Sequence, residues 1–189
     1  MPKNNYFLLR HGQTPYQLKK DKIIYPWPEP KPLLLTKKGK EEIKSIAKKL
    51  KKEKIDLIFS SDLPRTRQTA EIIAEETGSK IVYDQRLREI NVGIFRGRKI
   101  KEYYDYFSSP EEMFWKAPQK GENLREVQKR VFDFFKEIDK KYNRKNILIV
   151  SHGDPLWLLE GKIKKKSDAE LIKEKLEGKT IKIGELRKL

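Results

Sequence analysis

The chain has 189 residues, of which 37% are hydrophobic and 38% are charged, and its formal net charge at pH 7 is +16. It contains no cysteine and two histidines, which excludes a disulfide scaffold, a thiol nucleophile and a thiolate or histidine-rich metal site. Its longest apolar runs are far shorter than the roughly 20 residues that cross a bilayer. We therefore expect neither a secreted protein nor a membrane protein, and no zinc finger.

The first five residues contain no apolar signal-peptide region and lead directly into a strand-like segment, so we expect a cytoplasmic location. The positive charge favours an anionic partner, which is nucleic acid, an acidic membrane surface or a phosphorylated small molecule. Much of the excess is lysine in runs that also carry glutamate, at 37–54 and 162–175. Such runs are typical of solvated helical surfaces, so charge alone does not choose the partner.

Short apolar runs alternate with amphipathic segments, which is typical of parallel strands joined by crossover helices. The first half of the chain predicts strands at 6–9, 55–59 and 80–83. Five prolines between positions 15 and 32 exclude a helix directly after the first strand. One helix is predicted to begin after Thr36 as its N-cap, and another runs from a cap at Ser61 or Asp62 to Gly78.

The second half of the chain predicts helices at 99–107, 122–142, 156–159 and 169–176. The run 147–150 is apolar throughout, which is typical of a central strand covered on both faces. Asp154 is interpreted as the N-cap of the helix that begins at Pro155, and 180–183 as a last edge strand. No internal repeat, linker or domain boundary is visible, so we expect one α/β domain over residues 1–189.

Polar side chains follow the predicted strands, at the sheet edge where open α/β proteins bind their ligands. They are Arg10, His11 and Gly12 after the first strand, Ser61, Asp62 and Arg65 after the second, Arg88 and Glu89 after the third, and Ser151, His152 and Gly153 after the central strand. Both histidines of the chain are thus expected at one edge of one sheet. Such a coincidence is uncommon by chance, and it indicates a functional site.

The residue types at this edge suit a phosphoryl group. Arg10 and Arg65 offer planar, paired donors that match phosphate oxygens, and helix starts near Gly12 and Gly153 add backbone N–H groups. A neutral imidazole attacks phosphorus and holds the group covalently, while Glu89 protonates the leaving oxygen and later accepts a proton from water. The two arginines and the second imidazole offset charge on the transferring group, and the scheme needs no metal.

Some of these residues also have purely structural interpretations. Arg65 is alternatively a surface arginine, and Glu89 alternatively caps a turn or pairs with Arg88. The three tryptophans are interpreted as packing residues rather than as platforms for stacking nucleic-acid bases. A histidine after a strand is alternatively a capping or packing residue, but the adjacent Arg10 and Gly12 make that interpretation of His11 the less favoured one.

Four strand-end segments carry these residues: LRHGQT at 9–14, SSDLPRTRQTA at 60–70, LRE at 87–89 and VSHG at 150–153. Together, and in this order, they resemble the motifs of the histidine phosphatase superfamily, also called the phosphoglycerate mutase-like family. The likeness spans about residues 5 to 160. Each segment alone is weak, but four in order are a specific pattern.

The resemblance implies a three-layer α/β/α sandwich with a mostly parallel central sheet. It implies a phosphohistidine at His11, with Arg10, Arg65 and His152 around the phosphoryl group. In that scheme Glu89 acts first as an acid and then as a base. The residues His11, Glu89 and His152 are therefore the expected catalytic set.

The resemblance also places Gly12, Gln17 and Gly153 at the phosphate pocket. Gln17 stands where the family often has an asparagine, and Asn123 replaces a commoner serine. The part after His152 is short, and no arginine-rich segment at 99–120 resembles the phosphoglycerate clamp of the family's mutases. These departures favour hydrolysis over mutase chemistry.

Three functions remain open from the sequence. The leading hypothesis is a metal-independent phosphomonoesterase that hydrolyses phosphorylated small molecules through a phosphohistidine, without a cofactor. The first alternative is a cofactor-dependent phosphoglycerate mutase. The second is a basic module that binds RNA or another polyanion, but no nucleic-acid motif supports it, so nucleic acid is the less favoured partner. The sequence defines neither the substrate nor an oligomeric state.

The proline-rich segment and the region 99–119 are predicted to form the rim of the pocket. Their aromatic residues are expected to shape specificity: Tyr16, Tyr25, Trp27, Tyr103, Tyr104 and Trp115. Aromatic side chains supply large apolar area with few rotatable bonds, so they are suited to a pocket wall.

Overall fold

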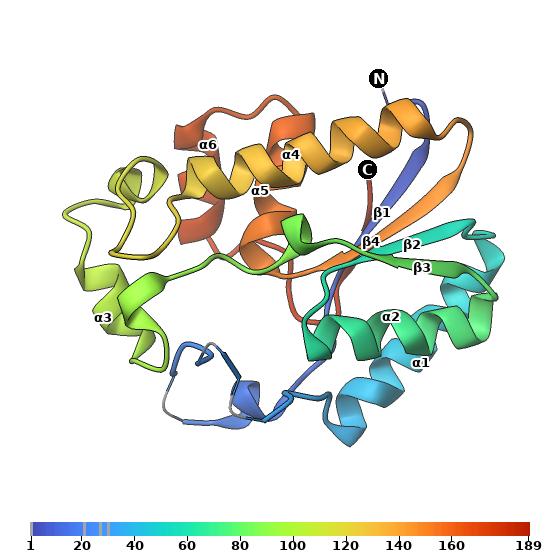
Figure 1. Ribbon diagram of the computed structural model, residues 1–189, viewed down its shortest axis with the longest axis horizontal. Coiled ribbons are helices and arrows are strands. Elements are labelled where there is room, and N and C mark those ends of the chain that lie inside the picture. Colours follow the sequence, from blue (N-terminus) through green and yellow to red (C-terminus); the bar gives the residue numbers. More distant parts are fainter. Residues whose placement is uncertain (1, 21, 27, 30) are drawn as a thin grey trace.

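A computed structural model describes the whole chain except residues 1, 21, 27 and 30 (Figure 1). The rim residue Trp27 therefore lies outside the described residues. The strands are β1 (Asn5–Arg10), β2 (Leu57–Ser60), β3 (Lys80–Tyr83), β4 (Asn146–Ser151) and β5 (Leu186–Lys188). The α-helices are α1 (Lys37–Lys52), α2 (Pro64–Thr77), α3 (Ile100–Asp105), α4 (Leu124–Lys141), α5 (Gly153–Ile163) and α6 (Asp168–Leu176). Short 3-10 helices occur at Pro15–Leu18, Gln85–Leu87, Gly93–Phe95 and Pro110–Phe114.

The five strands form one sheet in the order β3-β2-β4-β1-β5. Pairing is parallel throughout except between β1 and β5. Strand β4 lies in the middle, as its unbroken apolar run predicts, because such a run has no face that tolerates water. The prediction of a mostly parallel central sheet is confirmed.

Alternating side chains of the central strands face two separate cores. Tyr6 and Leu8 of β1 pack with α4 and α5, whereas Phe7 and Leu9 pack with α1 and α2. The two faces alternate because successive residues of a strand point to opposite sides of the sheet. Figure 1 shows the result, with α1 and α2 below the sheet and α4, α5 and α6 above it. The three-layer α/β/α prediction is confirmed.

The predicted edge strand at 180–183 is wrong, because the edge strand is β5, a few residues later. Ile181 is fully buried, but its carbonyl accepts a hydrogen bond from the Arg10 side chain instead of joining a strand ladder. A turn follows at Gly184, whose φ of +67° suits glycine. This turn aligns the next residues antiparallel to β1. The segment 180–183 therefore buries the Ile181 side chain without pairing as a strand.

Two predicted helix caps are also wrong. Helix α2 begins at Pro64 with Leu63 at the N-cap position, and Asp62 instead binds Arg88 through both carboxylate oxygens. Helix α5 begins at Gly153, so Asp154 lies inside its first turn and pairs with a lysine of α6. In both cases a tertiary ion pair takes the carboxylate that the local pattern assigned to a cap.

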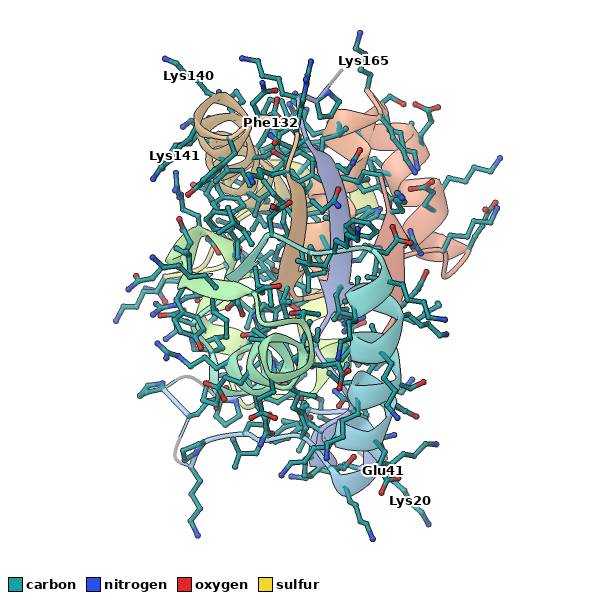
Figure 2. The ribbon with its side chains drawn as sticks, turned by 90° about the vertical axis from the view of Figure 1, so that its right-hand side faces the viewer. Lys20, Glu41, Phe132, Lys140, Lys141 and Lys165 are labelled. Atoms are coloured by element: carbon teal, nitrogen blue, oxygen red, sulfur yellow. The ribbon has the colours of Figure 1, made fainter. Side chains whose placement is uncertain are left out.

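The excess lysine lies mainly on the surface. Lys20, Lys140, Lys141 and Lys165 extend outward from different sides of the molecule (Figure 2), and each is exposed. This arrangement agrees with the interpretation of the lysine runs as solvated helical surface. None of the helices in the described parts of the chain is long and apolar enough to cross a membrane. The cytoplasmic location stays a prediction.

Asn123 provides the clearest structural cap. Its side-chain oxygen accepts from the Glu126 N–H at 2.9 Å, and the Glu126 carboxylate accepts from the Asn123 N–H at 2.8 Å. We expect Asn123→Ala to lower the free energy of unfolding by about 1 kcal/mol, because the first turn of α4 loses its acceptor. Urea denaturation measures the change.

Asn123→Ser is the matched control, since serine is an equally good N-cap and should retain nearly full stability. The affinity for inorganic phosphate should stay unchanged in both variants. A marked loss of phosphate affinity in a stable Asn123 variant would instead assign this side chain to the ligand pocket.

Candidate active site

The two histidines meet because their strands are neighbours in register. Arg10, at the end of β1, lies opposite Ser151, at the end of β4, so His11 and His152 follow at the same level. Their ring centroids are 5.3 Å apart and the rings meet edge to face. Both side chains are almost fully buried, at 2% and 0% exposure. The two rings therefore share one enclosed site, as expected for neighbouring strand ends.

His11 is fixed in one tautomer by its neighbour. Its Nδ1 lies 2.9 Å from the carbonyl oxygen of Gly12, and a carbonyl only accepts, so Nδ1 carries the proton. In the neutral ring Nε2 is then the nitrogen with a free lone pair. Burial, followed by the positive charges of Arg65 and Arg10, holds the pKa of His11 well below its usual range. At neutral pH the ring is uncharged and its Nε2 is available as a nucleophile.

His152 is held by Ser61, which belongs to the second of the four sequence segments, at 60–70. Its Nε2 lies 3.0 Å from the hydroxyl of Ser61, whereas its Nδ1 is buried without a hydrogen-bond partner among the described residues. Burial and the charge of Arg65 hold its pKa well below the usual range as well. A buried ring nitrogen without a partner is costly, and an incoming ligand atom is one way to satisfy it.

Arg10 and Arg65 present the same pattern to this site. Arg10 Nη1 donates to the carbonyl of Ile181 at 2.9 Å, and Arg65 Nη1 donates to Glu29 at 2.8 Å. In both side chains Nε is buried and lacks a partner within the described parts of the chain. Arginine N–H groups are strong donors that match phosphate oxygens in pairs. Each guanidinium is thus anchored at one end, with an unsatisfied donor elsewhere.

Glu89 lies beside the start of α5. Its carboxylate accepts from the N–H of Gly153 at 3.3 Å, so it reaches the helix that follows the second histidine. Burial first, and then the negative charge of Asp154, raise the pKa of Glu89, while Arg10 and Arg65 oppose the shift. A carboxyl group with a raised pKa is suited to hold a proton near neutral pH and to donate it.

Asp154 is itself paired across the fold. Its carboxylate accepts from Lys175 of α6 at 2.6 Å, and the lysine Nζ also lies 4.8 Å from the centre of the Trp157 ring. Burial acts to lower the pKa of Lys175, but Asp154, Tyr104 and Glu89 together outweigh it, so the pKa is raised. Helix α6 therefore delivers a charge partner to the residue next to Gly153.

Gly12 and Gly153 both lie where the chain packs closely. The Gly12 N–H donates to Thr69 at 3.1 Å and that of Gly153 donates to Glu89 at 3.3 Å, and their expected phosphate contacts stay a prediction. A Cβ on Gly153 would lie 3.0 Å from the Arg10 guanidinium. A Cβ on Gly12 would lie 2.8 Å from Ile43. Each glycine thus permits a close approach that positions the site.

Gln17 lies at the cavity but its oxygen is engaged. The side-chain carbonyl accepts from the N–H and the hydroxyl of Thr14 at 2.7 and 2.8 Å. The amide nitrogen donates to the hydroxyl of Tyr25 at 3.2 Å. Gln17 therefore braces the loop after β1, and the expected phosphate contact would need this network to rearrange.

A cavity of about 710 Å³ reaches the arginines and Glu89 of this site, whereas neither histidine is among its lining residues. Its lining includes Arg10, Arg65, Glu89, Gln17 and the aromatic side chains of Tyr16, Tyr25, Tyr103 and Tyr104. Those four tyrosines lie where the sequence predicted a rim. Trp115 is 58% exposed and lies outside the lining, so its predicted rim position is wrong. Cavities of this size hold drug-sized or metabolite-sized ligands.

One side chain at the site, Glu29, was not anticipated from the sequence, and Ser61 was expected at this edge but not as a partner of His152. Glu29 binds Arg65, and Ser61 binds His152. Ser61 stood in the recognised second motif but was assigned to a helix cap. Glu29 is the one acidic residue between positions 21 and 41, and this isolation in a proline-rich segment was the available signal. Among the described residues, no three His, Asp or Glu side chains are grouped to hold a metal ion.

Comparison with known proteins agrees with this geometry. The family model of the histidine phosphatase superfamily (branch 1) matches residues 6–185. The chain belongs to this superfamily.

Particular relatives differ in their stated activities. The chain is 32% identical over 127 residues to phosphoserine phosphatase 1 of Hydrogenobacter thermophilus, a match that covers 65% of this chain and 60% of that protein. It is 33% identical over 163 residues to a probable phosphoglycerate mutase, GpmB, of Escherichia coli, covering 81% of this chain and 71% of that protein. The chain thus spans less than two thirds of the first of these relatives.

A solved structure shows the same fold. A mycobacterial glucosyl-3-phosphoglycerate phosphatase superposes with a TM-score of 0.80 at 23% identity, covering 98% of this chain and 89% of that chain. At this identity the likeness concerns the fold alone. The fold described above is therefore shared with a solved structure.

Gly153→Ala tests whether the position of Arg10 matters for anion binding. Alanine keeps the backbone N–H but places a methyl group against the Arg10 guanidinium. We expect affinity for inorganic phosphate to fall about tenfold, the equivalent of roughly one charge-assisted hydrogen bond. Isothermal calorimetry measures the affinity, and thermal unfolding verifies the fold. Unchanged affinity in the folded variant would show that Arg10 does not contact the anion.

Proposed function

We propose that the protein is a metal-independent phosphomonoesterase that hydrolyses phosphorylated small molecules through a phosphohistidine on His11. The observation that carries the proposal is the buried, neutral pair of imidazoles at 5.3 Å, next to two arginines whose Nε groups meet no partner among the described residues. An uncharged nucleophile among fixed positive charges is what attack on a phosphate dianion requires. The phosphatase activity for which the Hydrogenobacter thermophilus relative is named supports hydrolysis as the reaction.

In the first step Nε2 of His11 attacks phosphorus and the P–O bond to the organic group breaks. Glu89 gives its proton to the leaving oxygen, so the product leaves as a neutral alcohol. Arg10, Arg65 and His152 stabilise the charge that spreads over the transferring group. The Nδ1–H bond to the Gly12 carbonyl steadies the imidazolium that forms on His11.

In the second step water attacks the phosphohistidine. The Glu89 carboxylate, now unprotonated, takes a proton from the water as the new P–O bond forms and the P–N bond breaks. Inorganic phosphate leaves, His11 returns to its neutral form and Glu89 is protonated again. Atoms and charge balance over the cycle, and all groups used belong to this chain.

Trapping the intermediate tests the proposal. After brief mixing with a phosphomonoester in the presence of a chelator and quenching in alkali, mass spectrometry should find phosphate on His11. His11→Ala should lose the label and lower hydrolysis by about 10³-fold or more, because the nucleophile is absent. His152→Ala is the matched control, because it removes the other of the two histidines in the chain. This variant should hydrolyse the substrate more slowly but still carry the phosphate on His11. Equal hydrolysis by wild type and His11→Ala would contradict the proposal.

The pH dependence gives a second test, with an alkyl phosphate whose leaving group needs a proton. Because the pKa of His11 is lowered, kcat/KM should persist below pH 6.5 and then fall as the ring protonates. Because the pKa of Glu89 is raised, the proton donor survives to higher pH than an ordinary glutamate, and kcat/KM falls above that pKa.

Substitutions that remove one charge of the Asp154–Lys175 pair should shift the alkaline limb of the pH profile, where kcat/KM falls, in opposite directions. Asp154→Asn removes a negative charge that raises the pKa of Glu89, so the limb should shift to lower pH. Lys175→Met removes a positive charge near the same groups, so the limb should shift to higher pH. Shifts of the same sign in both variants would show that Glu89 is not the group titrating.

A phosphoglycerate mutase is the second candidate, favoured by the 33% identity to the probable mutase over 81% of this chain. A coupled assay with 3-phosphoglycerate and catalytic 2,3-bisphosphoglycerate separates the two reactions. A phosphatase releases inorganic phosphate, whereas a mutase forms 2-phosphoglycerate.

A further inference from the structure

The contact between Glu29 and Arg65 joins the proline-rich segment to the site. Their side chains are 8% and 3% exposed, and Arg65 Nη1 donates to Glu29 Oε1 at 2.8 Å. The other carboxylate oxygen, Oε2, accepts from the N–H of Leu33 at 3.0 Å. Both oxygens of Glu29 are therefore engaged, one by its own loop and one by an arginine of α2, far along the chain.

Tyr25 restrains the same guanidinium from another direction. The Arg65 Cζ lies 4.3 Å from the centre of the Tyr25 ring, a cation–π contact. The Tyr25 hydroxyl in turn lies 2.5 Å from the Thr14 hydroxyl and accepts from Gln17 at 3.2 Å. The position of Arg65 is thus tied to the loop that follows His11.

The planar guanidinium of Arg65 offers different N–H groups to Glu29 and to a phosphoryl group. The group is planar, with its five N–H donors in fixed directions. Nη1 is bound by Glu29, while Nε lies on the opposite edge together with one N–H of Nη2. That edge suits bidentate binding of an oxyanion, and its Nε is buried and without a partner within the described chain. Glu29 therefore accepts a hydrogen bond from Nη1 and leaves the Nε edge of Arg65 for a phosphoryl group.

We propose that Glu29 is a positioning residue that holds the Arg65 guanidinium, against the Tyr25 ring, in the orientation that presents its Nε edge to the phosphoryl group. The inference rests on the proposed function and adds a residue to it from outside the four motifs. A buried arginine tolerates this setting because the carboxylate compensates its charge, although burial still lowers its pKa. Loss of Glu29 should leave Arg65 charged but free to turn away from the cavity.

A double-mutant cycle tests the proposal. Glu29→Ala should lower kcat/KM by about 100-fold, since a misplaced group of this kind has effects of that order. It should weaken inhibition by orthovanadate, a mimic of the transferring phosphoryl group, by a similar factor. In an Arg65→Ala background the same Glu29 substitution should cause little further loss, because its effect passes through Arg65. Glu29→Gln keeps one acceptor oxygen and should fall between wild type and Glu29→Ala.

Glu160 supplies a matched control at a distance from the cavity lining. It is also a buried carboxylate, 5% exposed, and accepts from Arg187 at 2.8 Å. Glu160→Ala should lower stability in thermal unfolding but leave kcat/KM and vanadate inhibition within about twofold of wild type. An equal loss of activity in Glu160→Ala and Glu29→Ala would overturn the proposal, since both would then act through stability.

Two other outcomes also overturn it. If Glu29→Ala binds vanadate more tightly than wild type, the carboxylate competes with the phosphoryl group and does not position Arg65. If the losses from Glu29→Ala and Arg65→Ala simply add, Glu29 acts independently of Arg65.

Calorimetry with inorganic phosphate repeats the cycle without turnover. A chain that hydrolyses no phosphomonoester would refute the proposed function, while the coupling in phosphate affinity would still decide the role of Glu29.

Discussion

Parallel pairing between β1 and β4 is the constraint on which the site depends. Because Arg10 lies opposite Ser151, the two residues that follow, His11 and His152, emerge at the same level of the sheet. A shift of one residue in either strand would move its side chains to the other face. The register is fixed by burial on both faces, since β1 and β4 each supply side chains to two cores. The packing that fixes the register of β1 and β4 therefore also fixes the relative position of the two histidines.

Burial then determines the chemistry of the groups brought together. The imidazoles lose their affinity for protons because they are enclosed next to two guanidinium groups. Glu89, in the same surroundings, gains affinity for a proton because burial and Asp154 outweigh the nearby arginines. The same environment thus favours the uncharged form of both His11 and Glu89. The reason is the same for both groups, because a charge is costly where water is excluded.

The positively charged side chains are held by partners from segments remote in sequence. Arg10 is anchored by the carbonyl of Ile181, and Arg65 by Glu29 and Tyr25. Each anchor uses one end of the guanidinium, which removes rotational freedom that phosphate binding would otherwise have to restrict. The segments outside the motifs therefore contribute precision to the site, and the cavity lined by tyrosines adds a surface for the organic part of a ligand.

The sequence by itself predicted the strands, most helices, the α/β layering and the four polar segments that meet at one sheet edge. It did so because apolar periodicity and the position of a residue at a strand end can be read locally from the sequence. A parallel sheet then brings the ends of its strands together at one edge. It misplaced the last strand, and it assigned Asp62, Asp154 and Ser61 to helix caps, because their actual partners are distant in the chain. Glu29 was not anticipated for the same reason.

What only the tertiary structure decided is which donors and acceptors pair. The N–H groups of Gly12 and Gly153, expected to bind phosphate, already donate to Thr69 and Glu89. The pKa directions of His11 and Glu89 likewise follow from enclosure by several elements at once. A single sequence records residue types and spacing, but desolvation and hydrogen-bond competition depend on three-dimensional neighbours, so these properties emerge only when the chain is folded.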